Sequence, residues 1–206
     1  MESDATSAHR RTTYHHGDLK AALVEAGIAL LEEVGPERLT LRGIAARVGV
    51  SHTAPKNHFD GLRGLLTAIA AEGFRRHAAA MTEAVPEDAG PQERLRAAAE
   101  GYAAFARANP ALFRLMFNPG LPDPSDPALQ EAGAESYAVL ARIARGLDWQ
   151  PLDGSPATPR KTELMIWSLV HGYATLEVCG MTGQDEPPPD VAQVMPWMDY
   201  RADRTP

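Results

Sequence analysis

Hydrogen-bonding side chains gather in one short segment near the N-terminal end of the chain, between residues 51 and 59. Hydroxyl, amide, imidazole and ammonium groups of this kind can contact the phosphates of nucleic acid or the edges of its bases. Two further polar residues, Thr40 and Arg42, lie about ten residues earlier in the chain. The alternative interpretation is that all these side chains form a solvated helix face and contact no nucleic acid. The candidate contact residues are Thr40, Arg42, Ser51, His52, Thr53, Lys56, Asn57 and His58.

Such side chains need a rigid support, and the surrounding sequence predicts short helices joined by a tight turn. Thr40 is expected to cap a helix with one apolar stripe, and Gly49 is expected to end it. Ser51 is then expected to cap a helix that carries residues 52–59, with Phe59 as its buried anchor. Two short helices joined in this way form a helix-turn-helix, whose second helix can enter the major groove. Short helix pairs also occur as plain packing motifs, so geometry alone leaves both interpretations open.

The rest of the chain also has helical spacing of its apolar residues, which predicts an all-α protein. The first helix is expected from about Asp18 to Gly35, and a fourth from about Leu62. Strands are not expected, because no run of alternating β-branched residues is present. The last two helices are expected at about Arg160–Met181 and Asp190–Arg201. Four stretches rich in proline and glycine separate the predicted elements: Pro86–Pro91, Asn118–Pro127, Pro151–Pro159 and Gly183–Asp190.

Charge is distributed unevenly along the 206 residues, whose net charge is −7. Basic and acidic residues balance at eight each up to Leu66, whereas 12 basic and 19 acidic residues follow. A neutral N-terminal part with local cationic points can approach phosphate, while an acidic remainder is repelled by it. Charge therefore permits nucleic-acid binding without demonstrating it.

Several classes of protein are disfavoured by the composition. Cys179 is the only cysteine, so an intramolecular disulfide is excluded, and we expect it to be a small buried hydrophobe. The polar N-terminus has no signal-peptide pattern, and no apolar run reaches the ~18 residues of a membrane helix, so a cytoplasmic protein is expected. His9, His15 and His16 lack the further ligands of a metal site. Catalytic motifs are absent too, so we expect no enzyme, cofactor or metal.

Two sequence stretches resemble the DNA-binding headpiece of the tetracycline repressor (TetR) family. They are LTLRGIAARVGVSHTAPKNHFDGLRGLL (Leu39–Leu66) and YHHGDLKAALVEAGIALLEEVG (Tyr14–Gly35). Two later stretches, YAAFARANPALFRLMF (Tyr102–Phe117) and WSLVHGYATLEVCG (Trp167–Gly180), resemble the C-terminal domain of one branch of that family, with its Trp…His-Gly pattern. The resemblance covers about three quarters of the chain.

This resemblance implies an all-helical homodimer that binds a palindromic operator and represses until a small molecule in the C-terminal domain releases the DNA. The implied division is a helix-turn-helix domain over 1–61, with an N-terminal arm over 1–16, and a helical ligand-binding and dimerisation domain over 62–206. Arg10 and Arg11 could form a minor-groove arm or a disordered tail. Candidates for the dimer face are Leu164, Leu169, Leu176, Val194, Trp197 and Met198.

Three positions depart from the family pattern. Lys56 replaces a usual tyrosine that contacts phosphate, and a lysine can make that contact as a point charge. Leu62 replaces a usual lysine, and Gly43 replaces the acidic capping-box partner of Thr40. Lys56 and Leu62 are the features that favour the alternative function, a small-molecule-binding helical protein with weakened or lost DNA recognition.

Aromatic and sulfur-containing residues in the C-terminal part could line a cavity for an apolar or amphipathic effector. Each of them alone is more often ordinary core, and we expect about half to face the cavity. The candidates are Tyr102, Phe105, Phe113, Met116, Phe117, Tyr137, Trp167 and His171.

Overall fold

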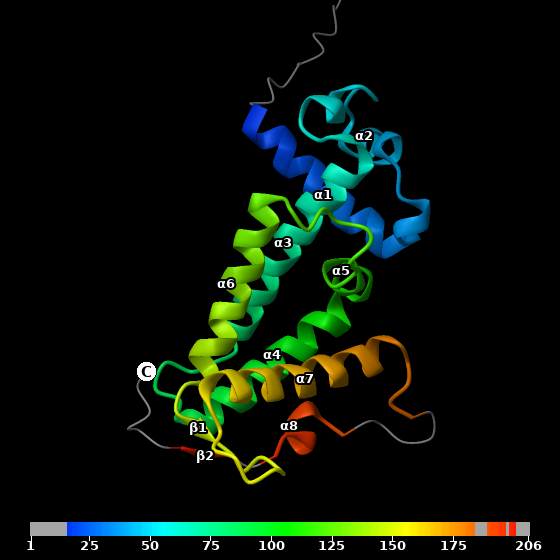
Figure 1. Cartoon of the computed structure of the whole chain (residues 1–206). Helices are drawn as coiled ribbons and strands as arrows, with labels where there is room; N and C mark the ends of the chain where they lie inside the picture. Colours follow the sequence, from blue (N-terminus) through cyan, green and yellow to red (C-terminus); the bar gives the residue numbers. More distant parts are fainter. Residues whose placement is uncertain (1–15, 184–188, 197, 201–206) are drawn as a thin grey trace, which may run out of the picture.

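The computed structural model describes residues 16–183, 189–196 and 198–200. Within them the chain forms a small helical head on a longer helical body, as Figure 1 shows. Arg10, Arg11, His9, His15 and Trp197 lie outside the described residues. No helix in the described part of the chain is long and apolar enough to cross a membrane.

The head contains α1 (His16–Val34), the 3-10 turn η1 (Pro36–Arg38), α2 (Leu41–Val48) and the 3-10 turn η2 (Ala54–Asn57). Thr40 caps α2 as predicted, because its hydroxyl accepts a hydrogen bond from the backbone N–H of Gly43 at 3.0 Å. Gly49 ends α2 in the left-handed conformation at φ 78°, which is also as predicted.

The prediction of a third α-helix over residues 52–59 is wrong, because the structure has only the single 3-10 turn η2 in this segment. An α-helix starting at Ser51 would place Pro55 four residues on, where its ring collides with the Ser51 carbonyl and no N–H is available. The chain instead makes a bond between residues three apart, from the Ala54 N–H to the Ser51 carbonyl at 3.0 Å. Ser51 does not cap a helix, because its hydroxyl lies 3.1 Å from that of Thr53.

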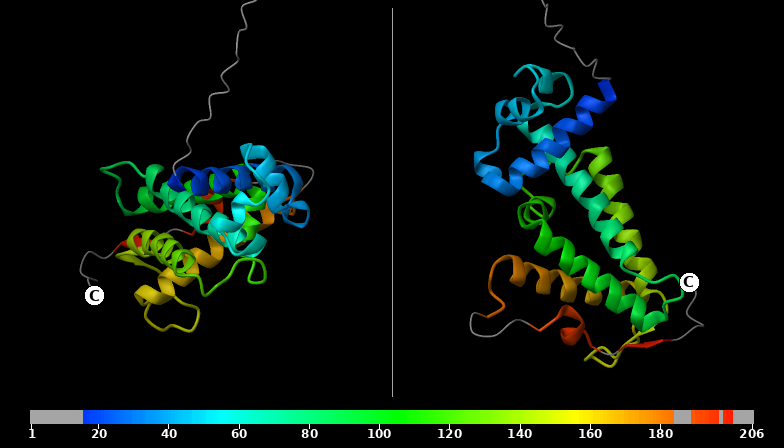
Figure 2. Two further views of the ribbon diagram at one scale, coloured as in Figure 1. Left: turned by 90° about the horizontal axis from the view of Figure 1, so that it is seen from above. Right: turned by 180° about the vertical axis from the view of Figure 1, so that it is seen from behind.

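The body is built on α3 (Gly61–Glu83), which begins in the head and runs down the body beside α6 (Pro127–Ala144). Figure 2 shows the same arrangement from above and from behind. The other helices are α4 (Pro91–Ala108), α5 (Pro110–Met116), α7 (Pro159–Val178) and α8 (Val191–Val194). Proline starts α4, α5, α6 and α7, because its fixed φ suits the first helical position.

The C-terminal end of the described chain differs from the prediction in three ways. The last helix is only the short α8, and the chain then pairs β2 (Asp199–Tyr200) with β1 (Leu147–Asp148) as an antiparallel two-residue ladder. Met198 was expected on an exposed dimer face but is fully buried in the monomer. Cys179 was expected to be buried but is exposed, because it follows the end of α7.

Candidate functional site

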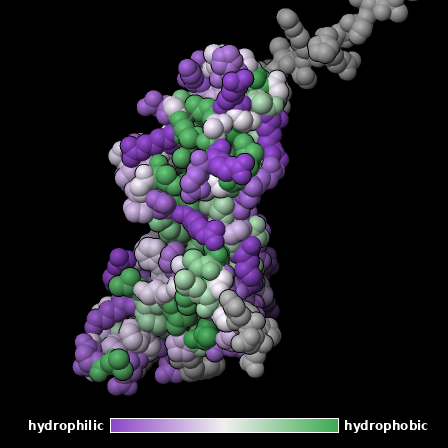
Figure 3. All heavy atoms as spheres, turned by 90° about the vertical axis from the view of Figure 1, so that its right-hand side faces the viewer, coloured by the Kyte–Doolittle hydropathy of each residue, from purple (hydrophilic) through white to green (hydrophobic). Residues whose placement is uncertain are grey.

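The first candidate site is the surface of the head around η2. Seven of the eight predicted contact residues are exposed on this small domain, and they are Thr40, Arg42, Ser51, His52, Thr53, Lys56 and Asn57. Thr40 is exposed but its oxygen is engaged in the α2 cap, and His58 is half-buried. Figure 3 shows hydrophilic residues around the top of the head, and hydrophobic and hydrophilic residues mixed over the rest of that face.

Pro55 and Phe59 hold this turn on the head, since both side chains are buried. Phe59 was predicted to be the core anchor, and this is confirmed. In a 3-10 turn residues three apart share a face, so Thr53 aligns with Lys56 and not with Asn57. The α-helix expected from the sequence would have placed Thr53 and Asn57 on one face, and the 3-10 turn does not, although both residues remain exposed.

The second candidate site is a cavity of about 270 Å³ in the body, between α3, α4, α6 and α7. Apolar and aromatic side chains make most of its wall, which is typical of small-molecule sites. Four of the eight predicted residues line it: Tyr102, Phe117, Tyr137 and Trp167.

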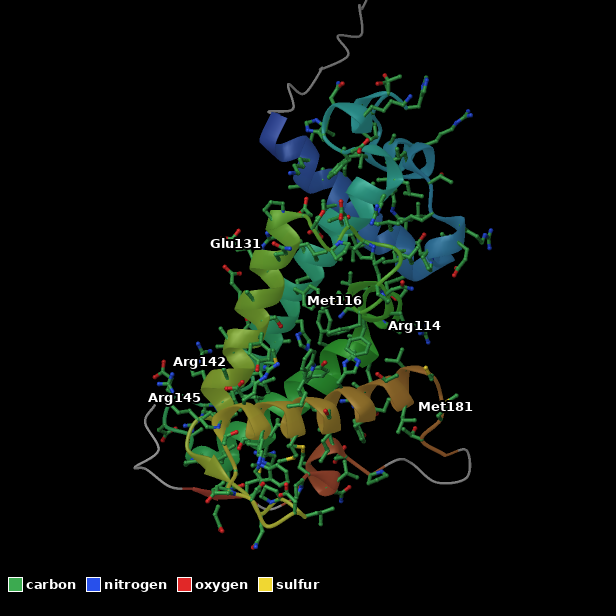
Figure 4. The ribbon with its side chains drawn as sticks, viewed as in Figure 1. Arg114, Met116, Glu131, Arg142, Arg145 and Met181 are labelled. Atoms are coloured by element: carbon green, nitrogen blue, oxygen red, sulfur yellow. The ribbon has the colours of Figure 1, made fainter. Side chains whose placement is uncertain are left out.

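The other four predicted residues, Phe105, Phe113, Met116 and His171, are not in the wall of the cavity. Phe105, Phe113 and Met116 are buried core residues. Met116 lies between α5 and α3 (Figure 4), close to Gly73, where a Cβ would come 2.7 Å from its sulfur. His171 supports the wall from behind, because its Nδ1 lies 2.8 Å from the Tyr102 hydroxyl and its ring meets that of Phe117 edge-on at 4.5 Å.

Sequence reasoning missed six residues of the wall: Phe74, His77, Met81, Gly133, Ser136 and Leu140. Helical spacing along α3 places Phe74, His77 and Met81 on one side of the helix, so this spacing in the sequence is the signal that could have found them. The α6 residues have no comparable signal, because Gly133 and Ser136 are small and interrupt the apolar pattern.

His77 is the most unusual group of the wall. Its Nδ1 lies 2.9 Å from the Ser136 hydroxyl, its ring meets Tyr102 edge-on at 4.2 Å, and only 3% of the residue is exposed. Burial, with a smaller contribution from nearby His171, lowers the pKa of His77 to about 3. Burial also lowers the pKa of His171 and raises the pKa of Tyr102 above its ordinary value. All three groups are therefore neutral near pH 7.

The head and the cavity are joined by shared elements. The first part of α3 packs on α1, and its later part supplies Phe74, His77 and Met81 to the cavity. Thr67 of α3 accepts a hydrogen bond from the backbone N–H of Asp123 at 2.8 Å, which ties α3 to the loop before α6. A displacement of the cavity wall can thus reach the head through one continuous helix.

Among the described residues, no cluster of three or more His, Cys, Asp or Glu side chains is arranged to hold a metal ion.

Comparisons with known proteins agree with this architecture. Residues 95–198 match the family model described as "Tetracyclin repressor-like, C-terminal domain". A solved protein of unknown function from Rhodococcus sp. RHA1 is 32% identical, with 89% of this chain and 93% of that one covered and a TM-score of 0.72. No curated protein sequence matches the chain.

Two more distant structures share the fold. The TetR family transcriptional regulator PfmR from Thermus thermophilus is 20% identical over 84% of this chain and 91% of that one, with a TM-score of 0.57. The transcriptional regulator FadR from Bacillus subtilis, solved in complex with stearoyl-CoA, is 16% identical over 84% and 92%, with a TM-score of 0.58.

A head with a helix, tight turn and exposed polar 3-10 segment, set on a helical body with a cavity, is a fold shared with the solved transcriptional regulators PfmR and FadR. The chain belongs to the tetracycline repressor family, which confirms the resemblance found in its sequence. The narrower assignment to the branch with the Trp…His-Gly pattern stays a prediction.

Proposed function

We propose that the protein is a ligand-responsive repressor that binds a palindromic operator as a homodimer. The observation that carries this proposal is the continuity of α3 (Gly61–Glu83), which starts directly after the polar turn η2 and continues into the cavity wall. A ligand that prefers one position of α3 over another changes the position of the head, whereas equal affinity for both positions changes nothing.

The surface of the head around η2 supports a role in DNA contact. Lys56 and Arg42 supply exposed positive charge, and Thr53 and Asn57 supply groups that can read bases. Since the remainder of the chain is acidic, favourable approach to DNA is confined to the head. Base contacts by Thr53 and Asn57 would specify the sequence, while Lys56 and Arg42 would mainly set affinity.

The body supports a role in effector binding. The cavity is lined mainly by apolar and aromatic side chains, and FadR, which has this fold, is solved in complex with stearoyl-CoA. An apolar or amphipathic effector suits such a wall.

A homodimer would place two heads at the spacing of two operator half-sites, about 34–36 Å or a multiple apart. Exposed apolar residues of α7 support this role, because Leu164 is 50% and Leu176 is 47% exposed. Leu169 lies seven residues before Leu176 and so on the same face of α7. Exposed Val194 of α8 adds to the candidate surface.

The test is a mobility-shift measurement on the DNA upstream of the protein's own gene, with a scrambled duplex as control. Binding to the upstream duplex and not to the scrambled one supports the repressor. Equal weak binding to both duplexes would instead favour a small-molecule-binding protein with lost DNA recognition. The oligomeric state of the same sample is measured by light scattering at micromolar concentration, and a strict monomer would contradict the dimer.

A further inference from the structure

One buried polar atom in the wall of the effector cavity has no partner. His77 uses Nδ1 for its contact with Ser136 at 2.9 Å, but no partner reaches its Nε2 within the described part of the chain. Buried nitrogens of this kind are nearly always paired in folded proteins, because leaving them unpaired costs free energy. An unpaired nitrogen in the wall of an apolar cavity is a group that a ligand can satisfy.

The charge of the wall limits what that ligand can be. No Asp, Glu, Lys or Arg is among the described residues that line the cavity, and the two aromatic hydroxyls are those of Tyr102 and Tyr137. The imidazole of His77 is neutral, because burial keeps its pKa at about 3. An ionised ligand would enter without a countercharge and would lose its hydration, which is strongly unfavourable.

The size and shape of the cavity limit the ligand further. A cavity of roughly 150 Å³ holds benzene, so the 270 Å³ found here suits a compact molecule of about ten non-hydrogen atoms. Aromatic side chains face it from four helices, α3, α4, α6 and α7, and from the segment after α5, and they include Phe74, Phe117 and Trp167. These faces suit a flat ring, which can pack edge-to-face against them.

We propose that the effector is a compact, uncharged ring compound with a single oxygen group that hydrogen-bonds to the His77–Ser136 pair. This inference rests on the proposed function of the body as the effector site and adds the chemical class of the effector. Either tautomer of His77 can serve, since its free nitrogen donates in one and accepts in the other, and the Ser136 hydroxyl can rotate to match. A phenol or an aromatic ketone meets the description.

The experiment compares three probes of one ring system on the full chain: naphthalene, 1-naphthol and 1-naphthoate. Binding is measured by quenching of tryptophan fluorescence, because Trp167 lies in the wall. We expect 1-naphthol to bind about 2- to 10-fold tighter than naphthalene, which is the range of one net hydrogen bond. We expect 1-naphthoate to bind more weakly than either.

Variants then assign the preference to the polar pair. His77→Phe keeps an aromatic ring and removes the hydrogen bond, so it should bind naphthalene as before and lose the preference for 1-naphthol. Ser136→Ala gives a second, smaller change should His77→Phe fail to fold. Ser125→Ala is the matched control for Ser136→Ala, because Ser125 is exposed on the loop before α6 and should leave the preference unchanged.

Equal affinity for naphthalene and 1-naphthol, tight binding of 1-naphthoate, or no binding of any probe to the folded protein would overturn the inference. Operator binding without a probe is measured in the same preparation. Failure of DNA binding with an intact 1-naphthol preference would overturn only the proposed function. Operator binding without a preference for 1-naphthol would overturn only this inference.

Discussion

The carboxylate of Glu32, on α1 of the head, accepts a hydrogen bond from the backbone N–H of Leu112 at 2.8 Å, at the start of α5. Its other oxygen accepts from the N–H of Ala111 at 3.0 Å. Free N–H groups at the start of a helix attract negative charge, so one side chain of the head satisfies two groups of the body. Since Phe117 of the cavity wall directly follows α5, this contact is a second connection between cavity and head, in addition to α3.

Loss of this contact should destabilise the protein. Glu32→Ala leaves two partly buried N–H groups without their partner, and we expect the free energy of unfolding to fall by about 1–2 kcal/mol. Urea denaturation measures the change. Glu33→Ala is the control, because the adjacent Glu33 pairs with Arg47 on the exposed surface of the head. An equal loss in both variants would contradict the connecting role of Glu32.

Stability should also depend on pH through His77. The unfolded chain takes up a proton near pH 6.5, whereas the folded chain, in which the pKa of His77 is lowered, resists protonation until about pH 3. The free energy of unfolding is therefore highest above pH 6.5, falls as the pH drops below it, and has lost the whole contribution at about pH 3. Between about pH 7 and pH 5 His77 should account for a loss of about 2 kcal/mol.

Urea denaturation at several pH values checks this dependence. His77→Phe removes the titrating group, so its stability should fall less than that of the unchanged protein over the same pH range. Burial lowers the pKa of His171 too, so part of the dependence should persist in the variant. Identical slopes for both proteins would show that His77 is not buried in its neutral form.

Local sequence signals predicted those features that depend on a few neighbouring residues. The cap at Thr40, the stop at Gly49 and the buried anchor Phe59 all follow from their own residue types and are confirmed. Tertiary features were predicted less well. Pro55 costs a helix about one hydrogen bond, yet its presence in the sequence did not show that the whole helix would shrink to one 3-10 turn.

The lining of the cavity in the body was also predicted only in part, because it depends on tertiary packing. Aromatic residues at Tyr102 and Trp167 could be predicted to face it, whereas the contact of His77 with Ser136 joins residues 59 positions apart on two helices. No local pattern reports such a pairing. The burial of Met198 likewise depends on how the chain after α8 returns to the body, which helical spacing does not encode.

Close packing of α3 against α4 predicts a strong effect at Gly101. A Cβ there would come 2.3 Å from the Ala80 carbonyl oxygen, so the two helices would have to separate. Gly101→Ala should lower the free energy of unfolding by about 1–3 kcal/mol. Gly64→Ala is the control, because its Cβ would meet its nearest neighbours at an ordinary 3.6 Å. That variant should be neutral or gain up to about 1 kcal/mol in urea denaturation.

A charge on the outer face of α7 should weaken the proposed dimer. Leu176 is 47% exposed in the monomer, so Leu176→Glu should leave the fold intact while placing a charge in an apolar interface. Light scattering should then show monomers at concentrations where the unchanged protein is dimeric. Leu152→Glu is the control, because Leu152 is fully exposed on the loop before α7. A dimer that survives Leu176→Glu would show that α7 does not form the interface through this residue.

DNA recognition should separate into contacts that set affinity and contacts that set sequence preference. Lys56 carries an exposed charge on η2, so Lys56→Ala should weaken binding to all duplexes alike and reduce the salt dependence by roughly one unit of slope. Asn57→Ala and Thr53→Ala should each relax discrimination at particular operator positions, by about 1–3 kcal/mol. Lys161→Ala, on α7 of the body, is the control for loss of a lysine and should change neither property.

Binding curves on cognate and scrambled duplexes at several salt concentrations decide this assignment of roles. The 3-10 geometry sharpens the test, because it places Thr53 and Lys56 on one face of η2 and turns Asn57 away from both. If Lys56→Ala alters sequence preference while Asn57→Ala leaves it unchanged, then Lys56 and Thr53 read the bases together and Asn57 lies outside the groove. If all three variants only weaken binding uniformly, sequence is read by other residues of the head.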